Sequence, residues 1–408
     1  MDRFIVVSSD CHAGLPIKEY REYLDPQFRE ILDQAAPIEI EMATKASESF
    51  LIKEINEQWR QGNEDVLTGA WDHDQRLKML DKDGIAVEVI FPDGITEVNM
   101  PPFGAGISLG VGEEIVPDLQ WAGARAHNRW LAELVGQSPE RHIGVAIIPL
   151  VWDIDQAVQE AKWAAENGLK GVVLPNLTRH HAGYNHTRYH PFWEACESLG
   201  LVVHFHSGAA PMEQYFGNDW PNTPADVDSP GAIGAYVSEV SWWTFRPATF
   251  LIWGGVFEKF PKLRVALTEA GTAWMIPPWM RLMDHHYHDK QFSAKMGDFT
   301  AHLSMSPSDY FRRNIAIGAS CTARADAEIR HELGLEQIMW GSDFPHPEGS
   351  WPHTYNQMTT AFGGFPQDEV GMMLGENAVN FYGLDREVLV PIAERIGPLK
   401  QDFDQVPQ

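Results

Sequence analysis

The chain alternates short apolar runs with longer amphipathic stretches, and this alternation repeats eight times. The apolar runs have the length and composition of buried strands, and the stretches between them show the 3.6-residue period of helices. The predicted strands are Phe4–Ser9, Ala86–Phe91, Gly144–Leu150, Gly171–Leu174, Leu201–His206, Arg264–Glu269, Ile315–Gly318 and Ile338–Gly341. The clearest predicted helices are Asp72–Lys82, Trp121–Val135, Ile154–Asn167 and Ala325–Leu333. This order predicts an α/β fold with parallel strands, and eight units favour a closed (β/α)8 TIM barrel over an open sheet.

Two segments are too long for a minimal barrel. We expect residues 1–408 to form one distorted barrel domain with an N-terminal insertion at about 16–70, a lid-like insertion at about 208–253 and a C-terminal helical extension at about 366–408. The first insertion contains a polar helical stretch, Ser47–Gly62, and the second is rich in Gly, Pro, Asp and Trp. Long loops in compact enzymes usually form lids or binding walls, and contact between subunits is the alternative.

Composition narrows the class of protein. Hydrophobic residues make up 44% of the 408 residues and charged residues 22%, which is typical of a soluble chain with a large core. The formal net charge of −26 argues against nucleic acid or an anionic membrane as the main partner, because both require a basic surface. No apolar run approaches 18 residues and no secretion signal is evident, so we expect no membrane span and a cytoplasmic location. Three widely spaced cysteines predict no disulfide framework.

Residues of the kinds that bind metals stand where several predicted strands end. They are Asp10, His12, His204, His206, Glu269, Asp343 and His346. Two of the pairs are spaced two residues apart, which places both side chains on the same side of an extended strand. In such barrels the catalytic groups come from the carboxyl ends of several strands. Because buried carboxylates need compensating charge, and because imidazole and carboxylate together suit zinc, iron or manganese, we predict one or two divalent metal ions.

Four longer motifs resemble the amidohydrolase superfamily, in particular the branch that contains aminocarboxymuconate semialdehyde decarboxylase and the resorcylate-type decarboxylases. The segment Trp71–Pro92, WDHDQRLKMLDKDGIAVEVIFP, is similar to that branch's first helix and second strand. The segment Gly254–Gly271, GGVFEKFPKLRVALTEAG, resembles its sixth unit. The most specific match is Trp340–Pro352, WGSDFPHPEGSWP, which resembles the eighth-strand signature. Gly375–Leu384, GENAVNFYGL, resembles the usual C-terminal helix.

The resemblance implies roles at individual positions. The family's first-strand motif is an acid or histidine, any residue, and a histidine, and it reads Asp-Cys-His at residues 10–12. His206 matches the fifth-strand histidine, and His204 is an additional residue. Asp343 matches the eighth-strand aspartate, which in the family binds metal, assists proton transfer or does both. Glu269 stands where the decarboxylases carry a histidine, which makes the set richer in oxygen and favours harder metals such as manganese or iron, with room for a second ion.

We assign the predicted roles as follows. The predicted metal ligands are Asp10, His12, His206, Glu269 and Asp343, and the predicted catalytic or substrate-orienting residues are Asp343, Glu269, His346 and His204. A metal lowers the pKa of a bound water toward neutrality, and Asp343 is placed to take a proton from that water. Glu269 is expected to act as a second-metal ligand or as a general acid.

Three functions follow from these assignments. The first is hydrolysis or non-oxidative decarboxylation of a small, partly apolar or aromatic carboxylated substrate, by a homodimer or higher homo-oligomer. The second is a non-haem iron or di-iron oxygenase on the same barrel, which the carboxylate-rich set favours. The third is a non-catalytic binding barrel. A histidine-rich loop at Arg179–Pro191 is expected either to contact substrate, through His180, His181, Tyr184 or Arg188, or to be solvated or internally hydrogen-bonded.

Overall fold

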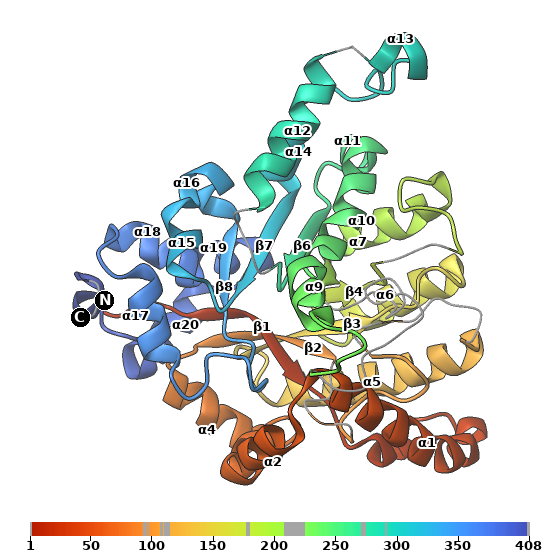
Figure 1. Ribbon diagram of the computed structural model, residues 1–408, viewed down its shortest axis with the longest axis vertical. Helices are drawn as coiled ribbons and strands as arrows, with labels where there is room; N and C mark the ends of the chain where they lie inside the picture. The colour runs from red at the N-terminus through yellow and green to blue at the C-terminus, as the bar shows by residue number, and fades with distance from the viewer. Residues whose placement is uncertain are drawn as a thin grey trace.

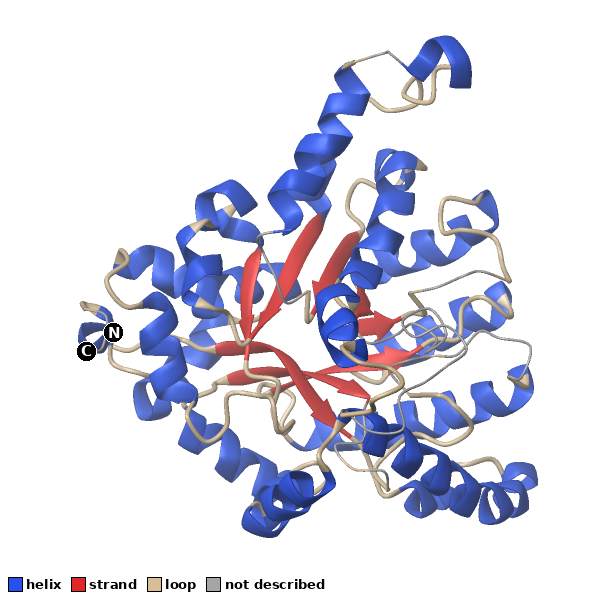
Figure 2. Ribbon diagram, in the orientation of Figure 1, coloured by secondary structure: helices blue, strands red, loops and turns tan. Residues whose placement is uncertain are grey.

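The computed structural model describes residues 2–92, 96, 98–106, 109, 115–176, 180–207, 225–270, 275–289 and 292–405. Its centre is an eight-stranded parallel sheet in the order β1 to β8, surrounded by helices (Figures 1 and 2). The strands are β1 (Val7–Ala13), β2 (Val87–Pro92), β3 (His142–Ile147), β4 (Gly171–Val173), β5 (Val202–His206), β6 (Arg264–Thr268), β7 (Ile315–Ser320) and β8 (Ile338–Gly341). The predicted (β/α)8 barrel is confirmed.

Strand β1 runs further than the sequence pattern predicted. Instead of ending at Ser9, it continues to Ala13 after an irregularity between Ser8 and Cys11, because its ladder with β2 resumes at Cys11 and Ile90. Polar side chains remain in this strand because it borders the mouth of the barrel. Asp10 and His12 are therefore part of the strand rather than residues that follow it.

The barrel closes between β1 and the residues that follow β8. The backbone N–H of Asp343 donates to the carbonyl of Asp10 at 2.9 Å, and that of His12 donates to the carbonyl of Phe344 at 2.7 Å. Two of the predicted metal-binding segments are thus joined directly by backbone hydrogen bonds. Their relative position is fixed by the fold itself.

The strands bury side chains on both faces. Alternate residues, including Val7, Val89, Val145 and Ala266, form a cluster in the interior of the barrel. The residues between them belong to a larger cluster beneath the surrounding helices, which includes Val6, Ile90 and Ala146. Burial on both faces explains why the predicted strands read as nearly continuous apolar runs.

The N-terminal insertion is helical. It contains η1 (Ile17–Glu22), α1 (Pro26–Phe50), α2 (Lys53–Gly62) and α3 (Glu64–Thr68). The predicted helical stretch Ser47–Gly62 is confirmed as the end of α1 and the whole of α2, which are separated by extended backbone at Leu51, with φ −111° and ψ 140°. Neither a glycine nor a proline stands at this break, so no local signal in the sequence could have predicted it.

The described part of the second insertion is also helical, although its composition is typical of a loop. It contains α9 (Ala232–Glu239) and α10 (Trp242–Trp253). Trp220 lies outside the described residues, whereas Trp242 and Trp243 begin α10. Further along, α12 (Ile276–His288) and α13 (Ser293–Met296) project from the barrel at the top of Figure 1.

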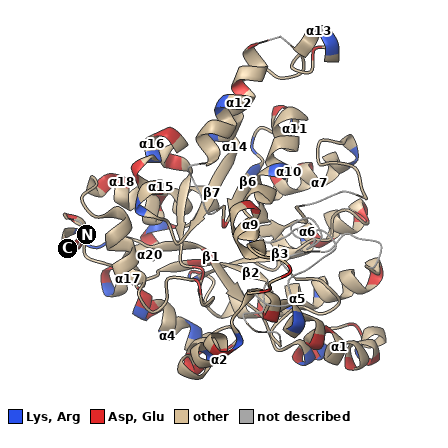
Figure 3. Ribbon diagram, viewed as in Figure 1, with Lys and Arg blue, Asp and Glu red and all other residues tan. Residues whose placement is uncertain are grey.

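The remaining helices cover the outside of the barrel. They are α4 (His73–Asp83), α5 (Pro117–Gln137), α6 (Ile154–Glu166), η2 (Thr187–Tyr189), α7 (His190–Leu199), α11 (Val256–Lys259), α14 (Pro307–Asn314), α15 (Arg324–Glu328), α16 (Arg330–Leu333), η5 (Leu335–Gln337) and α17 (Thr354–Phe362). The C-terminal segment adds α18 (Gln367–Gly371), η6 (Met372–Glu376), α19 (Asn377–Tyr382), α20 (Arg386–Ile396) and η7 (Lys400–Phe403). Both charge signs are spread over these outer elements (Figure 3). Among the described residues, no helix combines the length and the apolar character needed to cross a bilayer.

Candidate metal centre

Four of the predicted ligands meet inside the barrel at the carboxyl ends of β1, β5 and β8. His12 Nε2 lies 3.3 Å from Asp10 Oδ1 and 3.1 Å from Asp343 Oδ1. His206 Nε2 lies 3.2 Å from Asp10 Oδ1. All four side chains are buried. Parallel strands end on the same rim of the barrel, which brings together residues that are more than 300 positions apart in the chain.

His346 extends this group on the side of Asp343. Its Nδ1 lies 3.0 Å from Asp343 Oδ1, and its ring stacks on that of His12 with centroids 4.0 Å apart and planes 14° apart. The structure therefore places His346 beside the predicted ligands. It can share the carboxylate of Asp343 with His12.

Glu269 reaches the same group from the end of β6. Its Oε2 lies 3.6 Å from His206 Nδ1 and accepts a hydrogen bond from the hydroxyl of Ser207. Burial of the carboxylate, together with the negative charges of Asp343 and Asp10, raises the pKa of Glu269 to about 8, although its side chain is 31% exposed. Glu269 is thus suited to hold a proton near neutral pH, in contrast to the two aspartates.

His204 does not join this group, although it lies on the same face of β5 as His206. Two residues along a strand correspond to about 6.6 Å, so His204 sits one layer deeper in the barrel. Its ring stacks near that of Tyr382, and its nitrogens lie 3.4 Å from the hydroxyls of Thr268 and Tyr382. Burial lowers the pKa of His204 to about 3, so the ring is neutral and serves as interior packing with weak polar contacts.

The carboxylates and histidines of the group balance one another's charge. Burial opposes ionisation of Asp10, yet His206 and His12 hold the pKa of Asp10 well below its usual value. Burial and the nearby His346 oppose protonation of His12, but Asp10 and Asp343 raise its pKa to about 9. Two ionised, buried carboxylates therefore require positive charge, which either protons on the histidines or a bound cation can supply.

The donor set fits a divalent metal. Asp10, His12 and His206 each offer a ligand atom within 4.8 Å of the others, and so do His12, Asp343 and His346. Asp343 Oδ1 is buried and faces two imidazoles, at 3.1 Å from His12 Nε2 and 3.0 Å from His346 Nδ1, so the three side chains present their ligand atoms to one another. Imidazole nitrogen combined with carboxylate oxygen suits zinc, manganese or iron.

Sequence reasoning missed several residues that hold these ligands in place. The Ser320 hydroxyl donates to Asp10 Oδ2, and the Asn176 side chain donates to the carbonyl of His206 at 2.5 Å. Arg76 on α4 donates to the carbonyl of His12 at 2.9 Å. Of these three residues, only Arg76 lies in a motif that the sequence analysis singles out. The other two look like ordinary polar residues of a turn.

The backbone is constrained at the same rim. Glu269 and Cys321 directly follow β6 and β7, and Asp343 lies two residues beyond β8; their φ angles are +51°, +47° and +56°. Non-glycine residues rarely adopt this left-handed conformation, which costs on the order of 1 kcal/mol or more at each position. The surrounding strands must enforce it, and two of the three residues belong to the candidate centre.

The described residues of the histidine-rich loop make contacts both within the loop and with residues outside it. The Tyr184 hydroxyl donates to the carbonyl of Pro175 at 2.5 Å, and His186 Nδ1 accepts from the backbone N–H of Arg188 at 3.1 Å. The His181 ring lies edge-on to Trp152, with centroids 4.7 Å apart. These contacts favour the internally hydrogen-bonded alternative for His186, whereas Tyr184 is bonded to a residue that precedes the loop.

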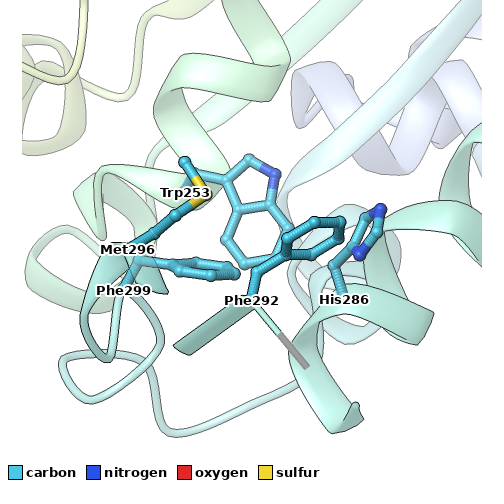
Figure 4. Close-up of a pocket in the computed structure, with 5 residues that line it drawn as sticks. All are labelled: Trp253, His286, Phe292, Met296 and Phe299. Atoms are coloured by element: carbon cyan, nitrogen blue, oxygen red, sulfur yellow. The ribbon is translucent and has the colours of Figure 1, made fainter. Parts of the chain in front are cut away.

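A separate apolar cavity of about 340 Å³ lies where α10 meets the projecting helices α12 and α13. It is lined by Trp253, His286, Phe292, Met296 and Phe299, whose side chains converge on it in Figure 4. None of these residues was a predicted site residue. The cavity is therefore a feature of the projecting helices and distinct from the candidate metal centre.

Comparison with known proteins gives a consistent result. The family described as Amidohydrolase matches residues 10–384. The chain is 21% identical over 326 residues to 2-amino-3-carboxymuconate-6-semialdehyde decarboxylase of Dictyostelium discoideum, covering 79% of each protein. It is 25% identical over 287 residues to gamma-resorcylate decarboxylase of Rhodococcus jostii, covering 67% of this chain and 77% of that protein.

A solved structure agrees with these matches. The crystal structure of a dihydroxybenzoic acid decarboxylase from Polaromonas, with bound manganese and the inhibitor 2-nitroresorcinol, superposes with a TM-score of 0.57 at 18% identity, covering 96% of this chain and 99% of that one. The fold is therefore shared with a manganese-containing protein. The family match spans nearly the whole barrel, including every strand end described above. The resemblance found in the sequence is confirmed, and the chain belongs to the amidohydrolase family.

Proposed function

We propose that this protein is a metal-dependent enzyme that removes carbon dioxide, without oxidation, from small hydroxylated aromatic carboxylates. The observation that carries the proposal is the buried set Asp10, His12, His206 and Asp343 at the carboxyl rim of the barrel. The relatives named above, whose names describe decarboxylases, support the choice of reaction. The aromatic substrate class is taken from the names of two of them and extended here to this chain.

Each residue has a role in this scheme. A divalent ion held by these residues would polarise an oxygen of the substrate carboxylate or phenol. Decarboxylation breaks the bond between the ring carbon and the carboxyl carbon, leaves the electron pair on the ring carbon and requires one proton there. We assign delivery of that proton to His346, with the ionised Asp343, whose Oδ1 lies 3.0 Å from His346 Nδ1, as the base that passes the replacement proton from water to the ring. His12, stacked on His346, keeps this pair in position.

The first test is direct. Protein loaded separately with manganese, zinc or iron(II) is incubated with 2,6-dihydroxybenzoate and other hydroxybenzoates, and carbon dioxide release is measured. We expect turnover with at least one metal and its loss on chelation. Asp343→Asn should lower kcat by a factor of about 10³ while circular dichroism shows an unchanged fold, because a group that transfers protons typically contributes 10²- to 10⁴-fold. Retained turnover in this variant would remove Asp343 from its assigned role.

Glu269 favours a second candidate function, a non-haem iron or di-iron oxygenase. It adds a carboxylate beside His206 and makes the donor set richer in oxygen. Oxygen consumption by the iron-loaded protein with a phenolic substrate would support this alternative. Carbon dioxide release under anaerobic conditions would exclude it. A homodimer or higher homo-oligomer is also part of our proposal.

A further inference from the structure

The two insertions of the barrel meet through a pair of aromatic rings. Phe50 is the last residue of α1, and Tyr236 lies in the middle of α9. Their ring centroids are 4.9 Å apart and the planes are inclined by 58°. Both side chains are only partly buried. Residues almost 190 positions apart are thus brought together by segments that a minimal barrel does not contain.

Tyr236 of this aromatic pair is linked electrostatically to the candidate metal centre. The phenol of Tyr236 interacts electrostatically with Glu269, which contacts His206, and with Glu348, two residues beyond His346. In the view of Figures 1 and 2, α9 is drawn in front of the strands of the barrel. Burial, and to a smaller extent these two carboxylates, raises the pKa of Tyr236 to about 12. Its hydroxyl therefore remains a neutral donor at physiological pH.

The chemistry of the rim and that of the insertions are complementary. The rim offers histidines and carboxylates, which bind a metal and hold a proton. The insertions offer two ring faces and one phenolic O–H, which suit a flat ring that carries a polar substituent. Packing between the insertions alone does not require a hydroxyl that interacts with two carboxylates, since phenylalanine would fill the same space.

We propose that Phe50 and Tyr236 form the roof of the substrate site and select planar aromatic substrates with a polar group on the edge remote from the metal centre. This inference rests on the proposed function for its substrate class. In it, Tyr236 donates its hydroxyl proton to that remote group in a hydrogen bond, while Phe50 packs on the ring and holds Tyr236 in place. Neither residue takes part in bond breaking.

Binding of a fixed probe tests the roof independently of turnover. Manganese-loaded protein is titrated calorimetrically with 2-nitroresorcinol, the inhibitor bound in the Polaromonas structure. The variants are Phe50→Ala, Tyr236→Ala and Tyr236→Phe. Val237→Ala is the matched control, because Val237 is the neighbour of Tyr236 on α9 and is 62% exposed. Manganese content and melting temperature are measured for every protein.

We expect both alanine variants to weaken probe binding by about five- to tenfold, which is typical of losing one aromatic contact. Tyr236→Phe should weaken it by about threefold through loss of the O–H donor, and Val237→Ala should leave it unchanged. Equal affinity in the wild type and the alanine variants, or no binding by the wild type, would overturn the inference. If the expected pattern is found but no hydroxybenzoate is decarboxylated, the roof is supported and the proposed reaction alone fails.

Discussion

A buried ion pair behind β1 connects α4 to the candidate centre. Arg76 lies between Glu88 and the backbone of β1, and its Nη2 donates to Glu88 Oε2 at 2.6 Å. The other oxygen of Glu88 contacts His142 Nδ1 at 2.8 Å. Burial opposes ionisation of Glu88, but Arg76 and His142 lower its pKa to about 2. The same guanidinium donates to the carbonyl of His12, so this charge pair fixes the backbone of a predicted metal ligand.

Replacing Arg76 by methionine should therefore be costly. The variant leaves Glu88 buried without its partner, and we expect a loss of about 3–5 kcal/mol in unfolding free energy. Urea unfolding measures this loss, and manganese retention after dialysis should fall as well. Arg21→Met is the control, since Arg21 pairs with Asp33 at the surface, where both side chains are more than 40% exposed. A loss in Arg76→Met no larger than that of the control would contradict the prediction.

Asp83, which lies away from the metal centre, makes the stability of the fold depend on pH. It is the last residue of α4 and is buried, and it accepts a hydrogen bond from Thr354 at 2.8 Å. Burial raises its pKa from 3.8 to about 7. A negative charge at the carboxyl end of a helix is also unfavourable to the helix dipole.

The sign of the effect follows from this raised pKa. The folded protein keeps a proton on Asp83 that the unfolded chain releases above pH 3.8. The contribution of this proton to the unfolding free energy is therefore complete below about pH 4 and is lost as the pH rises through 7. The loss amounts to at most about 4 kcal/mol. Asp83→Asn should therefore melt at a higher temperature than the wild type at pH 8 and at a similar temperature at pH 4. If the melting temperatures of Asp83→Asn and the wild type differed by the same amount at both pH values, Asp83 would not titrate in this way.

At the scale of elements, the close approach of β1 and β8 shapes the candidate centre. A Cβ on Gly341, the last residue of β8, would lie only 2.8 Å from Asp10 Cβ and 3.2 Å from Asp10 N. Glycine is therefore required for β8 to pack against the metal-binding part of β1. The hydrogen bond from Asp343 N to the Asp10 carbonyl, two residues further on, depends on the same approach.

Gly341→Ala should accordingly displace Asp10. We expect destabilisation of about 1–3 kcal/mol from overpacking and at least a tenfold loss of manganese affinity, because the ligand atoms separate. Unfolding curves and metal titration measure the two effects. Gly136→Ala on α5 is the control, since a Cβ added at Gly136 would meet no described atom within 4 Å. Unchanged manganese affinity in Gly341→Ala would show that β1 can shift without opening the centre.

Most of the strands, and the rim on which they end, could be predicted from the sequence. Parallel strands end on one rim, so the order of strands was enough to bring Asp10, His206 and Asp343 together. The pattern predicted the face of His204 but not its depth, because both histidines of β5 point inward. Supporting residues such as Ser320 and Asn176 could not be predicted, since a small polar residue after a strand equally indicates a turn.

At the scale of the whole molecule, α1 carries an apolar stripe outside the barrel. Ile31, Ile38 and Met42 are 40%, 60% and 66% exposed. Their spacing of seven and then four residues places them on one face of the helix. Single exposed apolar residues are common, but an aligned set marks a surface suited to contact another protein.

A second copy of this chain is the partner that we expect on this stripe. The net charge of −26 makes close approach of two copies electrostatically unfavourable, so association needs apolar contact and should become stronger as salt screens the repulsion. Light scattering during gel filtration should give at least twice the chain mass of 45.9 kDa. Ile38→Glu combined with Met42→Glu should reduce it to the mass of one chain. Val388→Glu on α20, at a side chain that is 44% exposed, is the matched control. A single-chain mass for the wild type, at low and at high salt, would contradict both the stripe and the expected oligomer.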